Sequence, residues 1–406
     1  MARALDGVRV VECGRWVSGP FCAKLLADLG AEVIKVEEPV EGDPSRRHGP
    51  FPQDVPHPEK SGLFLYLNTN KLGITLDLAT PAGKALLHRL AAEADILIED
   101  CPPQEAEKLG LDWESLRRVN PRLVVIAITP FGLTGPYRDY KAYHLNSFHA
   151  SGQGYILPWG SPNLEREPVK GGGLVGDYDT GVNAALATLA AFYWAMATGE
   201  GQLVDISQQE SLMALERIEM GRYPNDGVNP SRLAEAGYAG GRMVGGVMAC
   251  RDGYVVLTPA QERQWRALVE LMGNPEWASG EKARDEFARS RNAAELNRLI
   301  AAWMADKPKD WVYHCGQALG CPIGTVNSAE DLLHSQQLAA RGFFVDIDHP
   351  KAGKLKYPSA PYRFSKTPWA AARPAPLLGQ HNQEVYGGRL GHSDLELKKM
   401  REGGII

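Results

Sequence analysis

GVRVV at Gly7–Val11, FCAKLLADL at Phe21–Leu29 and AEVIKV at Ala31–Val36 are three consecutive apolar stretches near the start of the chain. The first and third are short and rich in Val and Ile, which predicts buried strands, whereas the middle one has the pattern of a helix that ends at Gly30. A strand, a helix and a strand within about 30 residues predict a right-handed β-α-β crossover and a parallel sheet. The loop between the first strand and the helix lacks the G-x-G-x-x-G spacing, so this stretch predicts the architecture but no NAD site.

Strands and helices continue to alternate along the first half of the chain, which predicts a doubly wound α/β domain whose ligand crevice lies at the carboxyl ends of the strands. Arg15-Trp16, Asp100-Cys101 and Pro130–Gly132 each follow a predicted strand, so they are either pocket residues or plain connecting loops. Thr80 is expected to cap a helix that has Pro81 at its first position. The further predicted elements are strands at Leu63–Leu67, Gly73–Leu78, Asp95–Glu99 and Leu123–Ile128, helices at Pro81–Ala94 and Leu116–Val119, and a strand that leads into a helix over Leu203–Met213.

A change in composition marks a domain boundary after this α/β region. Between about Glu219 and Gly246 the chain is rich in Gly, Arg, Asn and Pro, as the linkers between domains are. Because 406 residues exceed what one core usually holds, we predict a large domain over 1–220, a small α+β domain over 221–335 and a C-terminal segment over 336–406. Later elements are a strand at Tyr254–Leu257, helices at Gln264–Met272, Ala293–Met304 and Lys309–Leu319, a hairpin over Leu338–Pro350 and Lys354–Pro358, and a polar helix at Asp394–Met400.

The composition is that of a globular protein and argues against several classes. Hydrophobic residues make up 44% of the chain, and the net charge of −5 has both signs interspersed, so neither a nucleic-acid partner nor a membrane partner is expected. The six cysteines form no C-x-x-C pair and have no spaced histidine partner, so no metal site is expected. No signal peptide opens the chain and no run of about 18 apolar residues occurs, which predicts a soluble cytoplasmic protein.

The stretch KGGGLVGDYDTG at Lys170–Gly181 contains three consecutive glycines followed by an acidic residue, Asp177. A long apolar helix is predicted directly after it, over Val182–Ala197. Backbone N–H groups are free at the N-terminus of a helix, where they favour a carboxylate and can stabilise an oxyanion. One interpretation is that Asp177 or Asp179 only caps the helix. The other interpretation is that Asp177 is a nucleophile.

Two further features lie on either side of this stretch. His144 and His149 precede the glycines, and each is either a general base or a hydrogen-bonded structural histidine. A second glycine cluster can adopt positive φ and approach a ligand closely, or it can serve as a flexible linker. Its glycines are Gly240, Gly241, Gly245 and Gly246.

The order of these pieces resembles the family III CoA-transferases, a group that also contains the α-methylacyl-CoA racemases. The resemblance spans almost the whole chain and keeps its order. The matching segments are Gly19-Pro20, Leu25–Glu37, Gly42–Arg46, Asn70-Lys71, Leu76-Asp77, Gly132–Tyr137, Gly176-Asp177, Thr198–Gln202, Arg341-Gly342, His349-Pro350 and Pro374–Gly379.

The resemblance implies a Rossmann-like large domain made from both ends of the chain, a small domain in the middle, and two chains threaded through each other as interlocked rings. It also implies that Asp177 is the nucleophile and not a cap. The carboxylate would attack an acyl-CoA thioester and pass through a mixed anhydride to an aspartyl-CoA thioester, with water excluded and no ATP needed. Coenzyme A thioester is then a substrate, and no cofactor is bound permanently. Gly240–Gly246 resembles the flexible loop that covers the intermediate in some members.

The resemblance also implies a CoA-binding region, in which this sequence departs from the common pattern. Asp100–Gln104, Ala79 and Glu38 stand where the family often has basic or stacking residues. Either CoA sits differently here, or the chain is the weaker partner of a two-subunit enzyme. The CoA contacts implied are Arg15, Trp16, Val17, Ser18, Leu76, Asp100, Cys101 and Lys108.

We favour an acyl-CoA:carboxylate CoA-transferase with a donor such as succinyl-CoA, and two alternatives stay open. A racemase would pair Asp177 with His144, although the sequence around Asp177 is not that of the racemases and His144 is one position off the expected register. A non-catalytic chain would complete a heteromer with a homologous subunit. An aromatic acid such as benzylsuccinate would suit the aromatic residues in or near the pocket loops, which are equally compatible with core positions. These residues are Trp16, Phe148, Tyr155 and Trp159.

Overall fold

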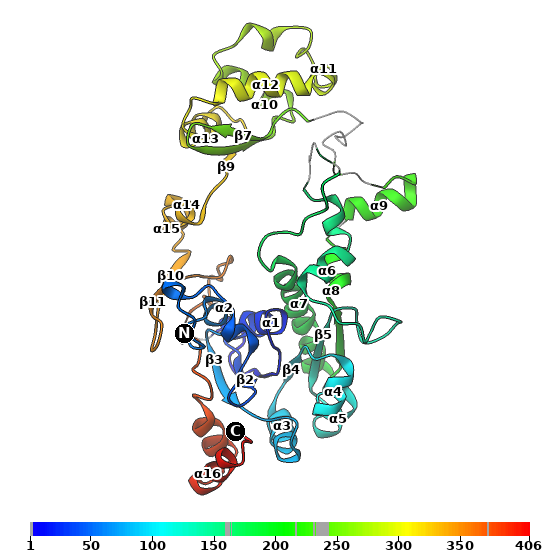
Figure 1. Cartoon of the computed structure of the whole chain (residues 1–406), viewed down its shortest axis with the longest axis vertical. Coiled ribbons are helices and arrows are strands. Elements are labelled where there is room, and N and C mark those ends of the chain that lie inside the picture. Colours follow the sequence, from blue (N-terminus) through cyan, green and yellow to red (C-terminus); the bar gives the residue numbers. More distant parts are fainter. Residues whose placement is uncertain are drawn as a thin grey trace. The chain divides into compact units, whose positions relative to one another are not determined.

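The computed structural model describes residues 3–158, 163, 165–215, 217–229, 232, 243–371 and 373–406 (Figure 1). These residues form two compact units. The first unit comprises Met1–Gly154, Lys170–Met220 and Ala340–Ile406, and the second comprises Tyr155–Val169 and Gly221–Ala339. The segment 155–169 therefore belongs to the second unit, whereas the predicted boundaries place it in the large domain, 1–220.

A six-stranded parallel sheet forms the centre of the first unit. Its strands lie in the order β3-β2-β1-β4-β5-β6, which is the order of doubly wound α/β sheets. The β-α-β unit that the first apolar stretches predict is present, and the expectation of a parallel sheet is confirmed. The elements are β1 (Arg9–Glu12), α1 (Ser18–Asp28), β2 (Glu32–Glu37), β3 (Lys71–Thr75), β4 (Ile96–Glu99), β5 (Val124–Thr129) and β6 (Leu203–Ser207).

Each face of this sheet has its own apolar core, because successive strand residues point to opposite faces. Val11 faces the core that α3 (Pro81–Glu93) covers, whereas Val10 faces the core that α1 and α7 (Val175–Thr198) cover. Coverage on both faces accounts for the nearly uninterrupted apolar strands. The remaining helices of the first unit are η1 (Pro44–Arg47), η2 (Pro52–Asp54), α2 (Gly62–Leu67), α4 (Pro103–Leu109), α5 (Trp113–Val119), α6 (His144–Ala150), α8 (Gln208–Met213), η6 (Gln383–Arg389) and α16 (Asp394–Glu402).

The predicted strand at Leu63–Leu67 is wrong, because these residues belong to helix α2. The hydroxyl of Ser61 accepts a hydrogen bond from the amide of Phe64, at 3.2 Å, and thereby caps the helix. A short apolar run has no hydrophobic periodicity that would distinguish a strand from a buried helix. The helix cap at Ser61 is the feature that distinguishes them here. The prediction that Thr80 caps the helix beginning at Pro81 is confirmed, because the hydroxyl of Thr80 accepts a hydrogen bond from the amide of Gly83 at 3.0 Å.

The second unit combines a small antiparallel sheet with helices that share one apolar core. Its strand order is β7-β8-β9, and both pairs are antiparallel. This agrees with the expectation of an α+β arrangement. The elements are β7 (Gly246–Cys250), β8 (Gly253–Leu257), α10 (Glu262–Leu271), η5 (Glu276–Ser279), α11 (Glu286–Arg291), α12 (Ala293–Met304), α13 (Lys309–Ala318), β9 (Ile323–Thr325) and α14 (Ala329–Leu333); η3 (Gln153–Ile156), α9 (Arg217–Asp226) and α15 (Gln336–Ala340) span the unit boundaries.

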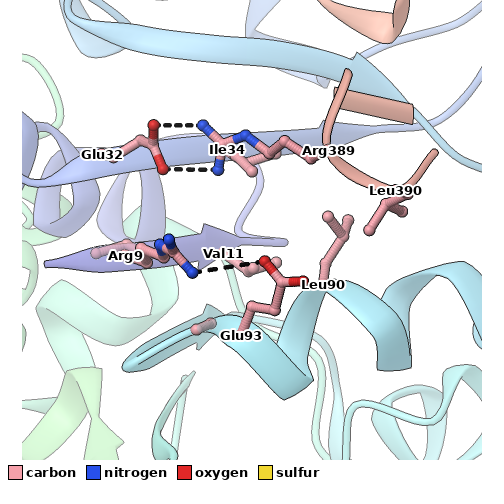
Figure 2. Close-up of a pocket in the computed structure, with 10 residues that line it drawn as sticks. Arg9, Val11, Glu32, Ile34, Leu90, Glu93, Arg389 and Leu390 are labelled. Carbon is pink, nitrogen blue, oxygen red and sulfur yellow. Dashed lines mark hydrogen bonds and ion pairs between the residues drawn. The ribbon is translucent and has the colours of Figure 1, made fainter. Parts of the chain in front are cut away.

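The C-terminal segment returns to the large sheet after the antiparallel hairpin of β10 (Phe344–His349) and β11 (Gly353–Pro358). The hydroxyl of Tyr386 donates a hydrogen bond to the carbonyl of Thr75, at 2.8 Å, and so joins the segment to β3. Figure 2 shows that the two Nη atoms of Arg389 donate hydrogen bonds to the two carboxylate oxygens of Glu32. Arg9 and Glu93 form a second ion pair beside them. Arg9 and Glu32 open their strands, so the small cavity between these side chains lies at the end of the sheet opposite the expected ligand crevice.

Buried ion pairs connect the first three strands. The ammonium of Lys35 on β2 lies 3.0 Å from a carboxylate oxygen of Glu12 on β1 and 2.8 Å from one of Asp43. The ammonium of Lys71 on β3 lies 2.7 Å from the other oxygen of Glu12. Lys35 also donates to the carbonyl of Gly14, and Lys71 donates to that of Pro20, at 3.0 and 2.9 Å. Lys35 therefore holds the loop between β1 and α1, and Lys71 holds the first turn of α1.

We expect Lys35→Met to lower the free energy of unfolding by about 3–5 kcal/mol, because it leaves the buried carboxylates of Glu12 and Asp43 without their shared cation. Arg9→Met removes a partner from an exposed ion pair and should cost less than about 0.5 kcal/mol. Urea titrations of the two variants and the unchanged protein measure both values. Similar losses in the two variants would contradict the role assigned to Lys35.

Candidate active site

Asp177 lies in the first turn of α7, as the third residue of a helix that begins at Val175 and not at Val182 as predicted. Leu174 occupies the N-cap position, and no side chain caps the helix. Gly173, with φ of +61°, makes the turn into the helix. The interpretation of Asp177 or Asp179 as a helix cap is therefore wrong.

The carboxylate of Asp177 is almost fully buried, and one of its oxygens is unpaired. The residue is 4% exposed. Oδ1 lies 3.4 Å from Nε2 of Gln208, whereas Oδ2 has no hydrogen-bond partner among the residues that the structure describes. Burial raises the pKa of Asp177 to about 7, and the positive charge of Lys170 opposes that rise. A buried carboxylate with a raised pKa and a free oxygen is a typical feature of catalytic sites.

Three other elements place polar side chains around Asp177. The hydroxyl of Ser18, at the start of α1, donates a hydrogen bond to the backbone carbonyl of Asp177 at 3.0 Å. The amide nitrogen of Gln208, at the start of α8, lies 3.3 Å from the same hydroxyl. The hydroxyl of Ser147 on α6 donates to Oε1 of Gln208 at 2.9 Å, which fixes the orientation of this amide. Sequence reasoning missed Gln208, although it follows the carboxyl end of a parallel strand, β6, as the predicted pocket residues do.

His144 contacts Gly176, the residue that precedes Asp177. Its Nε2 accepts a hydrogen bond from the amide of Gly176 at 3.0 Å, and its buried Nδ1 has no partner among the described residues. Burial, with the charge of Lys170, lowers the pKa of His144, so a neutral ring with its proton on Nδ1 fits these contacts. A Cβ at position 176 would lie 3.2 Å from Nε2, so Gly176 permits the close approach. His149 instead packs against Gly154.

A cleft of about 880 Å³ lies at the carboxyl ends of strands β1 to β4, where doubly wound sheets bind their ligands. Three of the implied CoA contacts, Arg15, Leu76 and Cys101, line this cleft. Asp100 fixes the backbone of Arg15 at the edge of this cleft, because its two carboxylate oxygens accept the backbone N–H of Arg15 at 2.7 and 2.9 Å. The cleft is lined by Cys13, Gly14, Arg15, Val36, Glu37, Glu38, Gly42, Asp43, Pro44, Arg47, Leu76, Asp77, Leu78, Ala79, Cys101, Glu105, Leu109 and Leu111.

Besides Asp100, four of the implied CoA contacts do not line this cleft. Val17 is buried, and Ser18 points to Asp177. Trp16 has a φ of +70°, and its ring lies 4.9 Å from that of His48. Lys108 is exposed on α4. The loop from Cys13 to Ser18 thus connects the cleft to the neighbourhood of Asp177.

The predicted loop and aromatic residues are only partly described. Gly240, Gly241 and Trp159 lie outside the described residues. Gly245 and Gly246, with φ of +113° and +100°, belong to the second unit, where the amide of Gly245 donates to Asn297 at 2.8 Å. Phe148 is buried in the first unit, and Tyr155 is exposed in the second. The role of the glycine cluster as a cover over the site stays a prediction.

Among the described residues, no group of three or more His, Cys, Asp or Glu side chains could hold a metal ion. One described helix, α7, is long and apolar enough to cross a membrane by length and composition. In this structure α7 packs against α1 and against strands β5 and β6, with Ala184, Ala191 and Ala195 in the apolar core. We therefore assign α7 as a core helix of the α/β unit.

Residues 5–382 match the sequence pattern of CoA-transferase family III. The chain belongs to this family. The match covers nearly the whole chain, so the resemblance given by the sequence motifs is confirmed. The protein is thus an enzyme of the CoA-transferase type, with a CoA thioester as substrate.

Named family members are similar to this chain over nearly their entire lengths. Succinyl-CoA--D-citramalate CoA-transferase of Chloroflexus aurantiacus is 34% identical over 100% of this chain and 98% of its own. Formyl-CoA:oxalate CoA-transferase of Streptomyces avermitilis is 33% identical over 100% of both chains. Succinate--glutarate CoA-transferase of Agrobacterium fabrum is 33% identical over 94% of both chains.

Solved structures show the same fold. A CAIB/BAIF family protein from Brucella suis is 31% identical, with a TM-score of 0.83 over 96% of this chain and 100% of that one. The hypothetical protein Rv3272 from Mycobacterium tuberculosis is 27% identical, with a TM-score of 0.78 over 95% of this chain and 99% of that one. The arrangement of α/β elements in this chain is thus shared with these two structures.

We expect Asp177→Asn to raise the free energy of unfolding by about 1–3 kcal/mol at pH 8, because it removes a buried charge that lacks full solvation. The folded-state pKa of Asp177 is about 7, and the unfolded value is about 3.9. The penalty of ionisation is therefore complete above pH 7 and disappears as the pH falls toward 4. Urea titrations at pH 8, 6 and 4.5 measure the trend.

The exposed Asp54 supplies the control. Asp54→Asn should change the free energy of unfolding by less than about 0.5 kcal/mol at every pH. A gain from Asp177→Asn that does not depend on pH would show that the carboxylate is not strained by burial.

Proposed function

We propose that the protein moves CoA between carboxylic acids by covalent catalysis, with Asp177 as the nucleophile. The observation that carries this proposal is the buried, unpaired Oδ2 of Asp177 in the first turn of α7, in a member of a CoA-transferase family. Oδ1 already faces Gln208. Oδ2 is thus the oxygen that is free to attack a carbonyl carbon.

The proposed reaction exchanges carbonyl derivatives of comparable energy. The carboxylate of Asp177 attacks the thioester carbonyl of the donor, and the C–S bond breaks to give an aspartyl mixed anhydride and CoA thiolate. The thiolate attacks the aspartyl carbonyl, forms an aspartyl-CoA thioester and releases the first carboxylate. An acceptor carboxylate then attacks the aspartyl-CoA thioester, and the same steps run in reverse. Covalent catalysis divides one difficult exchange into easier ones.

The neighbours of Asp177 support this role. The hydroxyl of Ser18 holds the backbone carbonyl of Asp177, and the amide of Gln208 donates toward Oδ1, so the attacking carboxylate keeps one orientation. The N-terminal end of α7 carries a positive partial charge, which favours the oxyanion of each tetrahedral intermediate. Burial limits water, which would hydrolyse the anhydride.

We propose succinyl-CoA as donor and a dicarboxylic acid as acceptor. The names of the relatives include succinyl-CoA, citramalate, succinate, glutarate and oxalate, and all of these acids carry two carboxyl groups. Benzylsuccinate, the aromatic acid that the sequence analysis considered, is a substituted succinate and stays within this class.

Incubation with succinyl-CoA should convert Asp177 into a thioester that hydroxylamine or borohydride traps, because the acyl exchange passes through a covalent enzyme. Intact-mass and peptide mass spectrometry should place the new mass on the peptide that contains Asp177. Asp177→Ala should form no adduct and should lose transfer activity by at least about a thousandfold. The exposed Asp54→Ala variant should form the adduct normally.

Other outcomes would favour the alternatives. Exchange of the α-proton of a branched acyl-CoA in deuterated water, without an adduct, would favour an isomerase that uses Asp177 and His144. Absence of both signals from the purified chain, with activity restored by a homologous subunit, would favour the heteromer.

We also propose the interlocked dimer and a cytoplasmic location. A row of large apolar side chains is exposed along α7, including Leu186 at 68% and Tyr193 at 75%. Such a contiguous apolar face is typical of a surface that another chain covers. The other exposed residues of this row are Val182, Trp194 and Met196.

The purified protein should have twice the chain mass of 44.3 kDa in multi-angle light scattering, and interlocked rings should make it unable to exchange chains. Tagged and untagged dimers that are mixed for days should form no mixed dimer until they are unfolded and refolded together. Leu186→Glu should reduce dimer recovery after refolding, because it charges the apolar face. Val55→Glu, at an exposed loop position, should not. Rapid exchange of chains would contradict interlocking.

A further inference from the structure

The two carboxylate oxygens of Asp177 have different surroundings. Oδ2 is the unpaired oxygen, whereas Oδ1 faces the side-chain amide of Gln208, whose nitrogen lies 3.4 Å away. Among the described residues, no other N–H or O–H group donates a hydrogen bond to Oδ1. Both residues belong to the first unit, although 31 positions separate them in the sequence. A negative charge that develops on Oδ1 therefore meets the amide of Gln208.

The backbone N–H groups next to this carboxylate are already engaged. The N–H of Gly176 donates to Nε2 of His144 at 3.0 Å. The N–H groups of Asp177 and Tyr178 both donate to the carbonyl of Leu174, at 3.0 and 3.2 Å. Backbone N–H groups are common donors of an oxyanion hole. These three groups, however, are not free to stabilise an oxyanion on the carboxyl group of Asp177.

The surrounding contacts fix which end of the Gln208 amide faces Asp177. Its Oε1 accepts a hydrogen bond from the hydroxyl of Ser147 at 2.9 Å. Its nitrogen also lies 3.3 Å from the hydroxyl of Ser18, which donates its own proton to the backbone carbonyl of Asp177. Exchange of the two ends of the amide would place Oε1 against a carboxylate oxygen, where neither group has a proton to donate. The two serines are buried, so these contacts keep an N–H group directed at Oδ1.

Oδ1 becomes an oxyanion twice in the proposed reaction. Once Oδ2 has formed the mixed anhydride, Cγ of Asp177 is an acyl carbon whose carbonyl oxygen is Oδ1. The CoA thiolate forms a C–S bond to Cγ, and the electron pair of the carbonyl moves onto Oδ1. The pair returns as the bond from Cγ to Oδ2 breaks, and Oδ2 leaves within the released carboxylate. Attack of the acceptor carboxylate on the aspartyl-CoA thioester places the same charge on Oδ1 before the C–S bond breaks.

We propose that the side-chain amide of Gln208 stabilises this oxyanion and that Ser147 positions the amide. In the anhydride and in the thioester Oδ1 is a neutral carbonyl oxygen, so the hydrogen bond from Gln208 strengthens as charge develops and lowers the barrier. The distance of 3.4 Å is long, as catalytic hydrogen bonds often are before the reacting complex forms. Gln208 is then a catalytic residue and Ser147 a positioning residue. This proposal rests on the proposed transferase function.

Gln208→Met removes the donor and keeps the length of the side chain. For transfer from succinyl-CoA to glutarate, kcat should fall by about 100- to 1,000-fold, the usual effect of losing one oxyanion donor. KM for succinyl-CoA should stay within about threefold, because the lost interaction forms only in the transition state. Gln209→Met is the matched control, since the side chain of Gln209, the next residue of α8, donates to the carbonyl of Ala150 at 2.9 Å. This variant should keep its kcat.

Ser147→Ala tests the positioning of the amide. Without the hydroxyl of Ser147, the amide of Gln208 can turn its oxygen toward Asp177, so kcat should fall by about tenfold. The double variant Ser147→Ala with Gln208→Met should have the kcat of Gln208→Met alone, because Ser147 acts through Gln208. Losses that multiply in the double variant would overturn the role of Ser147.

The discharge of the enzyme thioester separates this proposal from the proposed function. Enzyme loaded with succinyl-CoA and freed of the excess is mixed with hydroxylamine, which attacks Cγ of Asp177 and also places charge on Oδ1. Intact mass should show that Gln208→Met discharges at least about tenfold more slowly than the unchanged protein. Because only folded enzyme forms the thioester, misfolded protein does not contribute to this rate. In urea, the two loaded proteins should discharge equally fast.

Two results would overturn the role of Gln208. One is an equal rate of discharge in the folded unchanged protein and in Gln208→Met, and the other is an equal loss of kcat in Gln208→Met and Gln209→Met. Absence of the thioester from the unchanged protein would instead overturn the proposed function.

Discussion

The carboxylate of Glu12 accepts from Lys35 on one side and from Lys71 on the other, so one buried network joins β1, β2 and β3. Burial of these charges is costly unless every one is paired. The same lysines bind the backbone carbonyls of Gly14, in the loop between β1 and α1, and of Pro20, in the first turn of α1. That loop carries Arg15 into the cleft and Ser18 against the backbone of Asp177. The cleft and the candidate nucleophile therefore depend on the same buried charges.

Asp177 is also buried, but unlike the carboxylate of Glu12 it has no cation paired with it among the described residues. Its oxygen Oδ2 is buried without a partner in the described part of the chain, and its pKa is raised to about 7. A helix whose N-terminus needed only capping would have a polar residue at the N-cap position, but α7 has Leu174 there. The fold accepts a less stable ionised carboxylate at this position, as active sites do when a reactive group must stay available for chemistry. Gln208 and Ser18 hold the group without pairing its free oxygen.

Sequence patterns predicted the parts of the fold that depend on short-range order. The first β-α-β unit follows from apolar runs and one glycine, and the helix at Pro81 follows from a cap at Thr80. The prediction of a strand at Leu63–Leu67 was wrong because a short apolar run fits a strand and a buried helix equally well. The hydrogen bond from the amide of Phe64 to the hydroxyl of Ser61 is what identifies the helix. Gln208 was missed because its meaning comes from contacts with Asp177 and Ser147, which are distant in the sequence.

The departures from the family pattern acquire different meanings in the structure. Asp100, which stands where the sequence analysis expected a CoA contact, accepts the backbone N–H of Arg15 and so shapes the cleft from below. Glu38 lines the cleft and has no such structural partner. The departure at Asp100 is thus explained by a contact within the protein, and nothing in the structure explains the departure at Glu38. The cleft at the ends of β1 to β4 and the carboxylate on α7 thus involve different side chains, and residues such as Glu38 can vary while Asp177 keeps its buried position.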